Sequence, residues 1–252
     1  MTPADLSTAR IWITGGSSGI GAALAGELVS RGATVAISAR REDRLREVAG
    51  DEMTVVPLDV TDHDAVLAAA ARVREELGGI DMMVLSAGAW SQTDVGHWDV
   101  DAFRTQVEVN LLGASSCLAA VLPDMIARGA GTIVIVASVA GYRGIPGSEG
   151  YGATKAALLN LAESLRADLA PAGVVVQTVS PGFVRTEMTA TNTFTMPFLI
   201  DVDEAARSIA DGLATSRPEI VFPFRMAASA KLARLMPQRL WTLLWRRQSR
   251  LR

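Results

Sequence analysis

Apolar residues in this chain gather in short continuous runs, and longer segments rich in alanine and leucine separate these runs. A run that is apolar at nearly every position is typical of a parallel strand buried on both faces of a sheet. The runs fall at residues 10–14, 34–38, 53–60, 81–88, 131–138, 174–182 and 219–222.

The segments between the runs predict helices, which we expect over residues 19–31, 62–77, 101–128 and 151–169. Strands that alternate with helices form a parallel sheet through right-handed crossovers. The sequence therefore predicts an α/β protein with a doubly wound parallel sheet of about seven strands. We expect one domain over residues 1–224.

Residues 225–252 have a different character. This segment holds eight lysine or arginine residues and no aspartate or glutamate, and its leucines recur at helical spacing. Pro237 should split it into two short helices. We expect an extension of the domain that lies on an anionic membrane, docks on a second subunit, closes the substrate pocket or packs as an ordinary C-terminal helix; these alternatives stay open.

Composition narrows the function. A net charge of −3 over 252 residues offers no basic footprint for a nucleic acid. The single cysteine, Cys117, forms no internal disulfide and favours a reducing compartment, the cytoplasm or its membrane surface. The first ten residues lack the apolar core of a signal peptide, and no run reaches the roughly 18 apolar residues of a membrane-spanning helix.

Neither histidine predicts a catalytic or metal site. The acids around His63 fit a helix start in which Thr61 and Asp64 form a capping box. His97 stands alone in a predicted loop. We therefore expect no metal ion in this protein.

The stretch "TGGSSGIG", residues 14–21, follows the first predicted strand and opens the first predicted helix. Glycine lets the backbone approach a phosphate closely, and a helix N-terminus offers free N–H groups to an anion. The sequence therefore predicts a phosphate-binding turn.

With other motifs in order, this turn resembles the short-chain dehydrogenase/reductase family. These motifs are "LDV" at 58–60, "SAG" at 86–88, Asn110, Ser138, "YGATK" at 151–155 and "PGFVRT" at 181–186, so the resemblance covers about residues 10–222. It implies a Rossmann-type fold, a nicotinamide cofactor, and a homodimer or homotetramer built through helices 101–128 and 151–169. The implied cofactor contacts are Gly15, Ser17, Ser18, Gly19, Ile20, Gly21, Asp59, Val60, Ser86, Ala87, Gly88, Tyr151, Lys155, Pro181, Gly182, Val184 and Thr186. Ser86 departs from the asparagine that the family usually has there.

The stretch "SARRED" after the second strand indicates which nicotinamide binds. Ala39 stands where an NAD site has an acid for the ribose hydroxyls, and Arg40 and Arg41 follow. Arginine suits a 2′-phosphate through its charge and its planar donors. We expect NADP(H).

Tyr151 and Lys155 are four residues apart and share one face of a helix. A lysine charge about 4 Å from the phenol supplies about 4 kcal/mol, enough to lower its pKa by about three units. Tyr151 can then exchange a proton with the substrate. Ser138, at the end of the fifth strand, would hold the substrate oxygen. The resemblance gives Asn110 a water that links Lys155 to a proton path.

These residues predict an NADP(H)-dependent oxidoreductase that interconverts a carbonyl and an alcohol. Residues 187–201 should form a lid, and its apolar side chains favour an apolar substrate: Phe194, Met196, Phe198 and Leu199. An NADP(H)-binding regulatory protein without turnover is one alternative. A peripheral membrane protein that acts through its C-terminal tail is another.

Overall fold

The computed structural model describes residues 6–190, 192, 194–215 and 217–246. Parts of three predicted segments lie outside them: the start of the domain (1–5), two lid positions (191 and 193) and the end of the extension (247–252).

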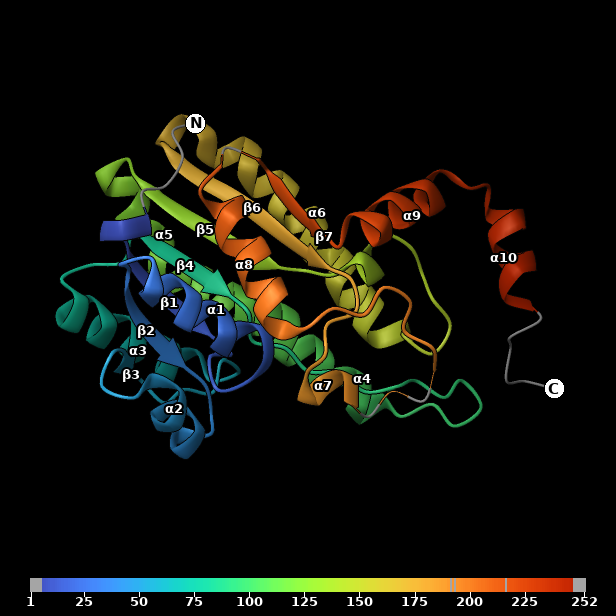
Figure 1. Ribbon diagram of the computed structural model, residues 1–252, viewed down its shortest axis with the longest axis horizontal. Helices are drawn as coiled ribbons and strands as arrows, with labels where there is room; N and C mark the ends of the chain where they lie inside the picture. The colour runs from blue at the N-terminus through green and yellow to red at the C-terminus, as the bar shows by residue number, and fades with distance from the viewer. Residues whose placement is uncertain (1–5, 191, 193, 216, 247–252) are drawn as a thin grey trace.

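The predicted doubly wound sheet is confirmed (Figure 1). In the described part of the chain, seven strands pair in parallel in the order β3-β2-β1-β4-β5-β6-β7. This order reverses direction beside β1, where open sheets of this kind bind ligands at the carboxyl ends of their strands. The strands are β1 (Arg10–Thr14), β2 (Thr34–Ser38), β3 (Thr54–Val55), β4 (Met82–Leu85), β5 (Gly131–Val136), β6 (Val174–Pro181) and β7 (Glu219–Phe222).

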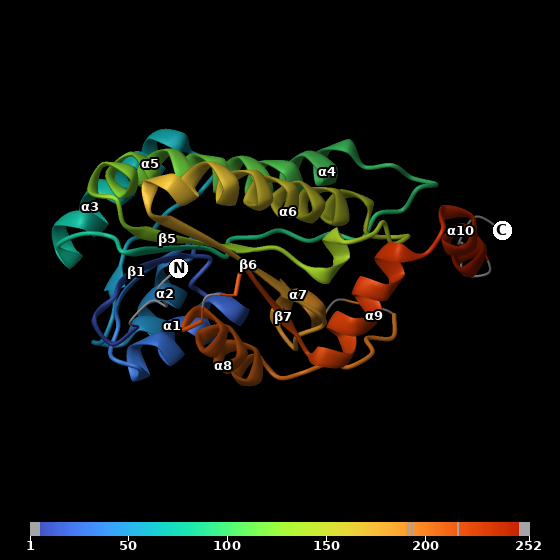
Figure 2. The same ribbon diagram turned by 90° about the horizontal axis from the view of Figure 1, so that it is seen from above.

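Helices cover both faces of the sheet (Figure 2). On one face lie α3 to α6; on the other lie α1, α2 and α8, while α9 and α10 extend beyond the body from the end of β7. The α-helices are α1 (Gly19–Ser30), α2 (Glu42–Ala49), α3 (His63–Leu77), α4 (Val100–Val107), α5 (Gly113–Arg128), α6 (Glu149–Leu169), α7 (Glu187–Ala190), α8 (Val202–Leu213), α9 (Phe224–Leu235) and α10 (Gln238–Arg246). Short helical turns are η1 (Leu6–Thr8), η2 (Glu108–Leu112), η3 (Val139–Gly141) and η4 (Ala170–Ala172).

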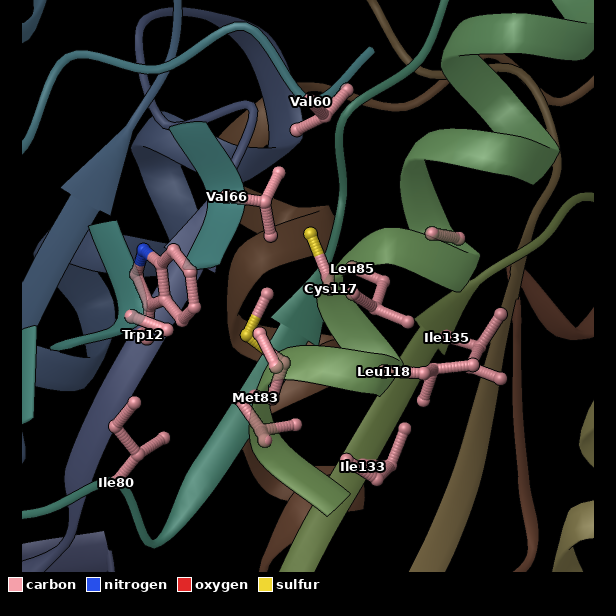
Figure 3. Close-up of a cluster of buried hydrophobic side chains, with 14 of the residues drawn as sticks. Trp12, Val60, Val66, Ile80, Met83, Leu85, Cys117, Leu118, Ile133 and Ile135 are labelled. Carbon is pink, nitrogen blue, oxygen red and sulfur yellow. The ribbon is translucent and has the colours of Figure 1, made fainter. Parts of the chain in front are cut away.

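The core has one apolar layer on each face of the sheet. Figure 3 shows the layer beneath α3 and α5, where Trp12, Met83 and Ile133 of the strands meet Cys117 and Leu118 of α5. The Cys117 side chain is 1% exposed, and burial raises the pKa of its thiol to about 12. Cys117 therefore contributes to packing, and its buried, protonated thiol is a poor nucleophile.

Two local predictions were wrong, and some helices were not predicted. The expected strand 53–60 is regular only over Thr54–Val55, although the N–H groups of Val56 and Leu58 still donate to the carbonyl oxygens of Ile37 (3.0 Å) and Ala39 (2.9 Å). The α3 helix is capped by Asp62, whose side chain accepts a hydrogen bond from the Ala65 N–H (2.9 Å), and Thr61 instead bonds Asp59. Helix α8, which connects β6 to β7, is not among the predicted helices.

The expected helix 101–128 is divided by a π-helical turn, η2, between α4 and α5. Among the described residues, the stretch Val100–Arg128 is the one long and apolar enough to cross a membrane by length and composition. A core helix of a globular fold passes the same test, and 44% of this apolar stretch is buried inside the protein.

The extension forms two helices, α9 and α10, on either side of Pro237, as the sequence predicts. The domain boundary at residues 224 and 225 stays a prediction.

Candidate active site

A cavity of about 610 Å³ opens at the carboxyl ends of the central strands. It is lined by all nineteen residues predicted to touch the cofactor, from the glycine turn (15–21), the arginine pair, the 59–60 and 86–88 loops, α6 and the segment 181–186. Segments that are far apart in the sequence therefore meet at one edge of the sheet.

The glycine turn has a backbone that other residues cannot adopt. Gly15 has a φ of 75°, and a Cβ there would lie 2.7 Å from the Ser86 carbonyl oxygen. A Cβ on Gly21 would lie 2.3 Å from the Gly15 oxygen. The turn thus packs directly against the start of α1 and the 86–88 loop.

The N-terminus of α1 faces this cavity without a side-chain cap. The N-cap residue is Ser18, and its side chain makes no capping hydrogen bond. Its hydroxyl instead accepts a hydrogen bond from Arg41 (2.9 Å). The free first-turn N–H groups and the helix dipole fit a phosphate, so these residues suit a dinucleotide.

The two arginines after β2 differ in their contacts. Arg41 also pairs with Glu187 of α7 (3.2 Å) and so bridges the mouth of the cavity. Arg40 lines the same cavity, is exposed, and has no ion pair among the described residues. Arg40 is therefore a positive charge that is free to meet an anionic ligand.

Ser138, Tyr151 and Lys155 lie together on the inner wall. Ser138 follows β5, and its Oγ accepts a hydrogen bond from the Ala140 N–H (3.1 Å). Tyr151 and Lys155 come from the first turns of α6, with the Lys155 Nζ 5.4 Å from the centre of the Tyr151 ring. The expected shared face of the helix is present.

The pKa of Tyr151 is not lowered, in contrast to the expectation from the sequence. Burial raises the pKa of the phenol to about 12, although a hydrogen bond with Ser138 opposes this shift. Lys155 donates to the Val136 carbonyl oxygen (2.7 Å), and burial lowers the pKa of its ammonium to about 8. Burial is thus the main cause of the raised pKa of Tyr151, and the expectation based on the lysine charge left burial out.

Asn110 stands behind the site rather than in the cavity. It sits in the π-helical turn η2, and its side chain is 1% exposed. Its Oδ1 accepts from the Ala89 N–H (2.6 Å), while its Nδ2 donates to the Ala89 oxygen (3.1 Å) and to Thr154 (2.9 Å). Asn110 thus fixes the loop after residues 86–88 to α6. Its role in a water relay stays a prediction.

A second cavity, of about 740 Å³, adjoins the first, and Ser138 and Tyr151 line both. Its wall is mainly apolar and draws on the lid, on loop 90–95 and on both C-terminal helices. Phe194 of the predicted lid lines it, whereas Phe198 stacks against Arg225 instead (4.6 Å).

Several residues of this wall were not predicted from the sequence. Trp90 packs edge-on against Tyr151 (5.3 Å between ring centres) and donates to Asn192 (3.1 Å). The one sequence feature that could have pointed to Trp90 is its position two residues after the "SAG" motif. Trp241 and Trp245 also line the cavity, so the C-terminal extension closes the pocket, one of the alternatives that the sequence left open.

Comparisons with known proteins agree on one family. Residues 9–196 match the family model described as short chain dehydrogenase. An uncharacterized oxidoreductase from Myxococcus xanthus is 38% identical over 97% of this chain and 99% of its own length. A short-chain dehydrogenase from Streptomyces avermitilis has a similar structure, with a TM-score of 0.83 and 29% identity over 96% of this chain and 98% of its own. So has a short chain dehydrogenase from Burkholderia cenocepacia in complex with NADP, with a TM-score of 0.85 and 29% identity over 96% and 99% of the two chains.

Proposed function

This chain belongs to the short-chain dehydrogenase family and is an oxidoreductase, and from that premise we propose that it uses NADP(H) to interconvert a carbonyl and an alcohol. The observation that carries the proposal is the meeting of the two cavities at Ser138 and Tyr151. One cavity suits a dinucleotide; the other suits an apolar substrate. The side chains between them can act on a substrate oxygen.

The choice of NADP(H) rests on charge. Arg40 and Arg41 bring two guanidinium groups to the cavity, and Ala39 leaves out the carboxylate that would repel a 2′-phosphate. The Burkholderia relative, which was solved with NADP, supports the same choice. When bound, the nicotinamide would give a hydride to the carbonyl carbon or take one from the alcohol carbon.

The protein groups act on the substrate oxygen. The Ser138 hydroxyl donates a hydrogen bond to it and orients the carbonyl. The Tyr151 hydroxyl gives that oxygen a proton in reduction and takes it back in oxidation. Its raised pKa keeps the proton on the phenol at neutral pH, which favours reduction. Lys155 stabilises the tyrosinate through its charge while it is protonated, and we propose that it also holds the nicotinamide ribose.

The second cavity indicates an apolar substrate. Its wall includes Phe183, Phe194, Met226 and the tryptophans of α10, and a pocket lined in this way binds chiefly through burial of apolar surface.

We also propose a cytoplasmic homodimer or homotetramer. The large apolar side chains of Val100 and Leu112 are exposed along α4 and η2, where a second subunit would bury them.

Oxidation of NADPH and of NADH against carbonyl compounds graded by size and polarity tests the proposal. We expect turnover with NADPH and a loss of about 10²–10⁴-fold in Tyr151→Phe, with NADPH binding retained. Tyr142→Phe is the matched control for loss of a phenol hydroxyl: Tyr142 also lines the second cavity, but its hydroxyl donates to Glu219, and Tyr142 does not line the first cavity. Tight NADPH binding without turnover on any carbonyl would instead favour the regulatory alternative.

A further inference from the structure

Each of the two C-terminal helices has apolar side chains on two of its faces. Met226, Ala230 and Ala233 of α9 line the substrate cavity, as do Trp241 and Trp245 of α10. The tryptophans on this inner side are partly buried because they line the cavity. Other large apolar side chains of the same helices do not line the cavity and are exposed.

The outer side carries six of these side chains, between 53% (Leu240) and 83% (Phe224) exposed. At 100° per residue they fall on one face of each helix, away from the cavity-lining residues. The six are Phe224, Leu232 and Leu235 of α9 and Leu240, Leu243 and Leu244 of α10. Leaving so much apolar surface in water is unfavourable, and patches of this kind mark interaction sites.

Positive charge surrounds this outer face. Residues 224–246 include four arginines and one lysine but no acid. Lys231 pairs with Glu219 (3.1 Å), and Arg225 stacks on Phe198. Arg239 and Arg246, which flank the leucines of α10, form no ion pair with any residue that the structure describes. The face therefore fits an anionic partner.

The helices are held against the protein and are not a loose tail. Arg143 donates hydrogen bonds to the carbonyl oxygens of Ala233 (2.7 Å) and Met236, at the end of α9. Its guanidinium lies 4.9 Å from the ring centre of Trp241, whose Nε1 donates to Gly144 (2.8 Å). These contacts tie both helices to the loop that precedes α6. Figures 1 and 2 show the two helices extending from the body after β7.

A second copy of the chain fits this face poorly. A symmetric dimer would place the same patch on both subunits. Arginines would then face arginines, with no carboxylate in residues 224–246 to pair with them. Phosphates of a lipid surface supply the missing negative charge, and the acyl region beneath them accepts the leucines.

We propose that the outer face of α9 and α10 docks on an anionic lipid surface. The leucines enter the boundary between headgroups and acyl chains, and the arginines contact the phosphates. Because the inner side of the same helices walls the cavity, docking brings an apolar pocket next to a lipid phase.

Co-sedimentation of the full chain with vesicles tests this directly and needs no turnover. We expect binding to phosphatidylcholine vesicles that contain phosphatidylglycerol, weaker binding at high salt, and little binding to phosphatidylcholine alone. Leu240→Gln/Leu244→Gln should weaken partitioning by about tenfold or more, because two buried leucines are lost. Arg239→Gln/Arg246→Gln should weaken it by about tenfold.

Leu67→Gln is the matched control, since Leu67 is an exposed leucine on α3, far from these helices in sequence. It should bind vesicles like the wild type. Circular dichroism would verify that each variant is folded, so that lost binding reports the surface alone.

Three results would overturn the proposal. The first is equal binding of the wild type and the leucine variant, and the second is no binding of the wild type to anionic vesicles. The third is a smaller oligomer of the leucine variant in size-exclusion chromatography with light scattering, which would show that a second copy covers this face.

Discussion

Arg40 and Arg41 are neighbours in sequence but have different surroundings. Arg41 is already engaged by Ser18 and Glu187, whereas Arg40 lines the cavity without an ion pair in the described residues. The pattern "SARRED" cannot distinguish the two, because Glu187 lies 146 positions away from Arg41. Arg40 is therefore the charge that we propose as the main contact of a 2′-phosphate.

Replacing Arg40 by glutamine should weaken NADPH binding by about 10–100-fold, since one charge-assisted hydrogen bond to the 2′-phosphate is lost. NADH binding should change little. Fluorescence titration of both cofactors measures this. Arg44→Gln is the control, because Arg44 pairs with Glu47 on the outside of α2. An equal loss for both cofactors would contradict the assignment.

Lys155 should make stability depend on pH. Its pKa falls from 10.5 in the unfolded chain to about 8 in the folded one, so the unfolded state binds more protons between these values. Stability therefore rises with pH across this window. Relative to Lys155→Met, the wild type should gain about 2 kcal/mol in unfolding free energy between about pH 7.5 and about pH 9.5.

Urea denaturation at the two pH values measures this gain. The chain has one other lysine, Lys231, which is exposed and paired with Glu219. Lys231→Met should show the same pH dependence as the wild type. A Lys155→Met curve parallel to the wild type would mean that the buried ammonium keeps its ordinary pKa.

At the scale of elements, the attachment of α9 and α10 to the loop that precedes α6 joins residues that are about 90 positions apart in the sequence, such as Arg143 and Ala233. One side chain, Arg143, binds carbonyl oxygens at the end of α9, the Gln238 side chain (3.2 Å) and the face of Trp241. Cations near a helix C-terminus are stabilising. This loop lies between Ser138 and Tyr151, so the wall of the second cavity and the two proposed catalytic residues are held by the same segment.

Arg143→Gln should weaken the attachment of α9 and α10, which form part of the wall of the second cavity. We expect about a tenfold loss in kcat/KM for large apolar carbonyl substrates, mostly through KM, because their distal contacts depend on the two helices. Small carbonyl substrates and NADPH affinity should be unaffected. Steady-state kinetics on a size series measures the difference, with Arg72→Gln on α3 as a surface control. Uniform losses across the series would contradict the positioning role.

The elements that sequence predicts well are those with a local signal. Continuous apolar runs indicate the strands, and Pro237 marks the break between α9 and α10. The π-helical turn has no such signal. It occurs where the Asn110 side chain meets Ala89 and Thr154, so tertiary hydrogen bonds decide it.

At the scale of the whole molecule, parallel strands bring the motifs to one edge, which is why the lining of the first cavity could be predicted residue by residue. The lining of the second cavity could not, because its wall combines Trp90 with Trp241 and Trp245 from the far end of the chain. No spacing rule links positions so distant. Their meeting depends on the path that the chain takes after β7.

The burial of Cys117 has a practical consequence for this molecule. Cys117 is the chain's single thiol and is 1% exposed on the buried side of α5. It should resist maleimide labelling while the fold is intact and react once the sheet and α5 separate. The rate at which Cys117 is labelled, measured by mass spectrometry, would then report the rate of global unfolding. A cysteine introduced at an exposed position of α10 could meanwhile carry a spin label or a dye alone. Fast modification of the native protein would show that α5 opens independently.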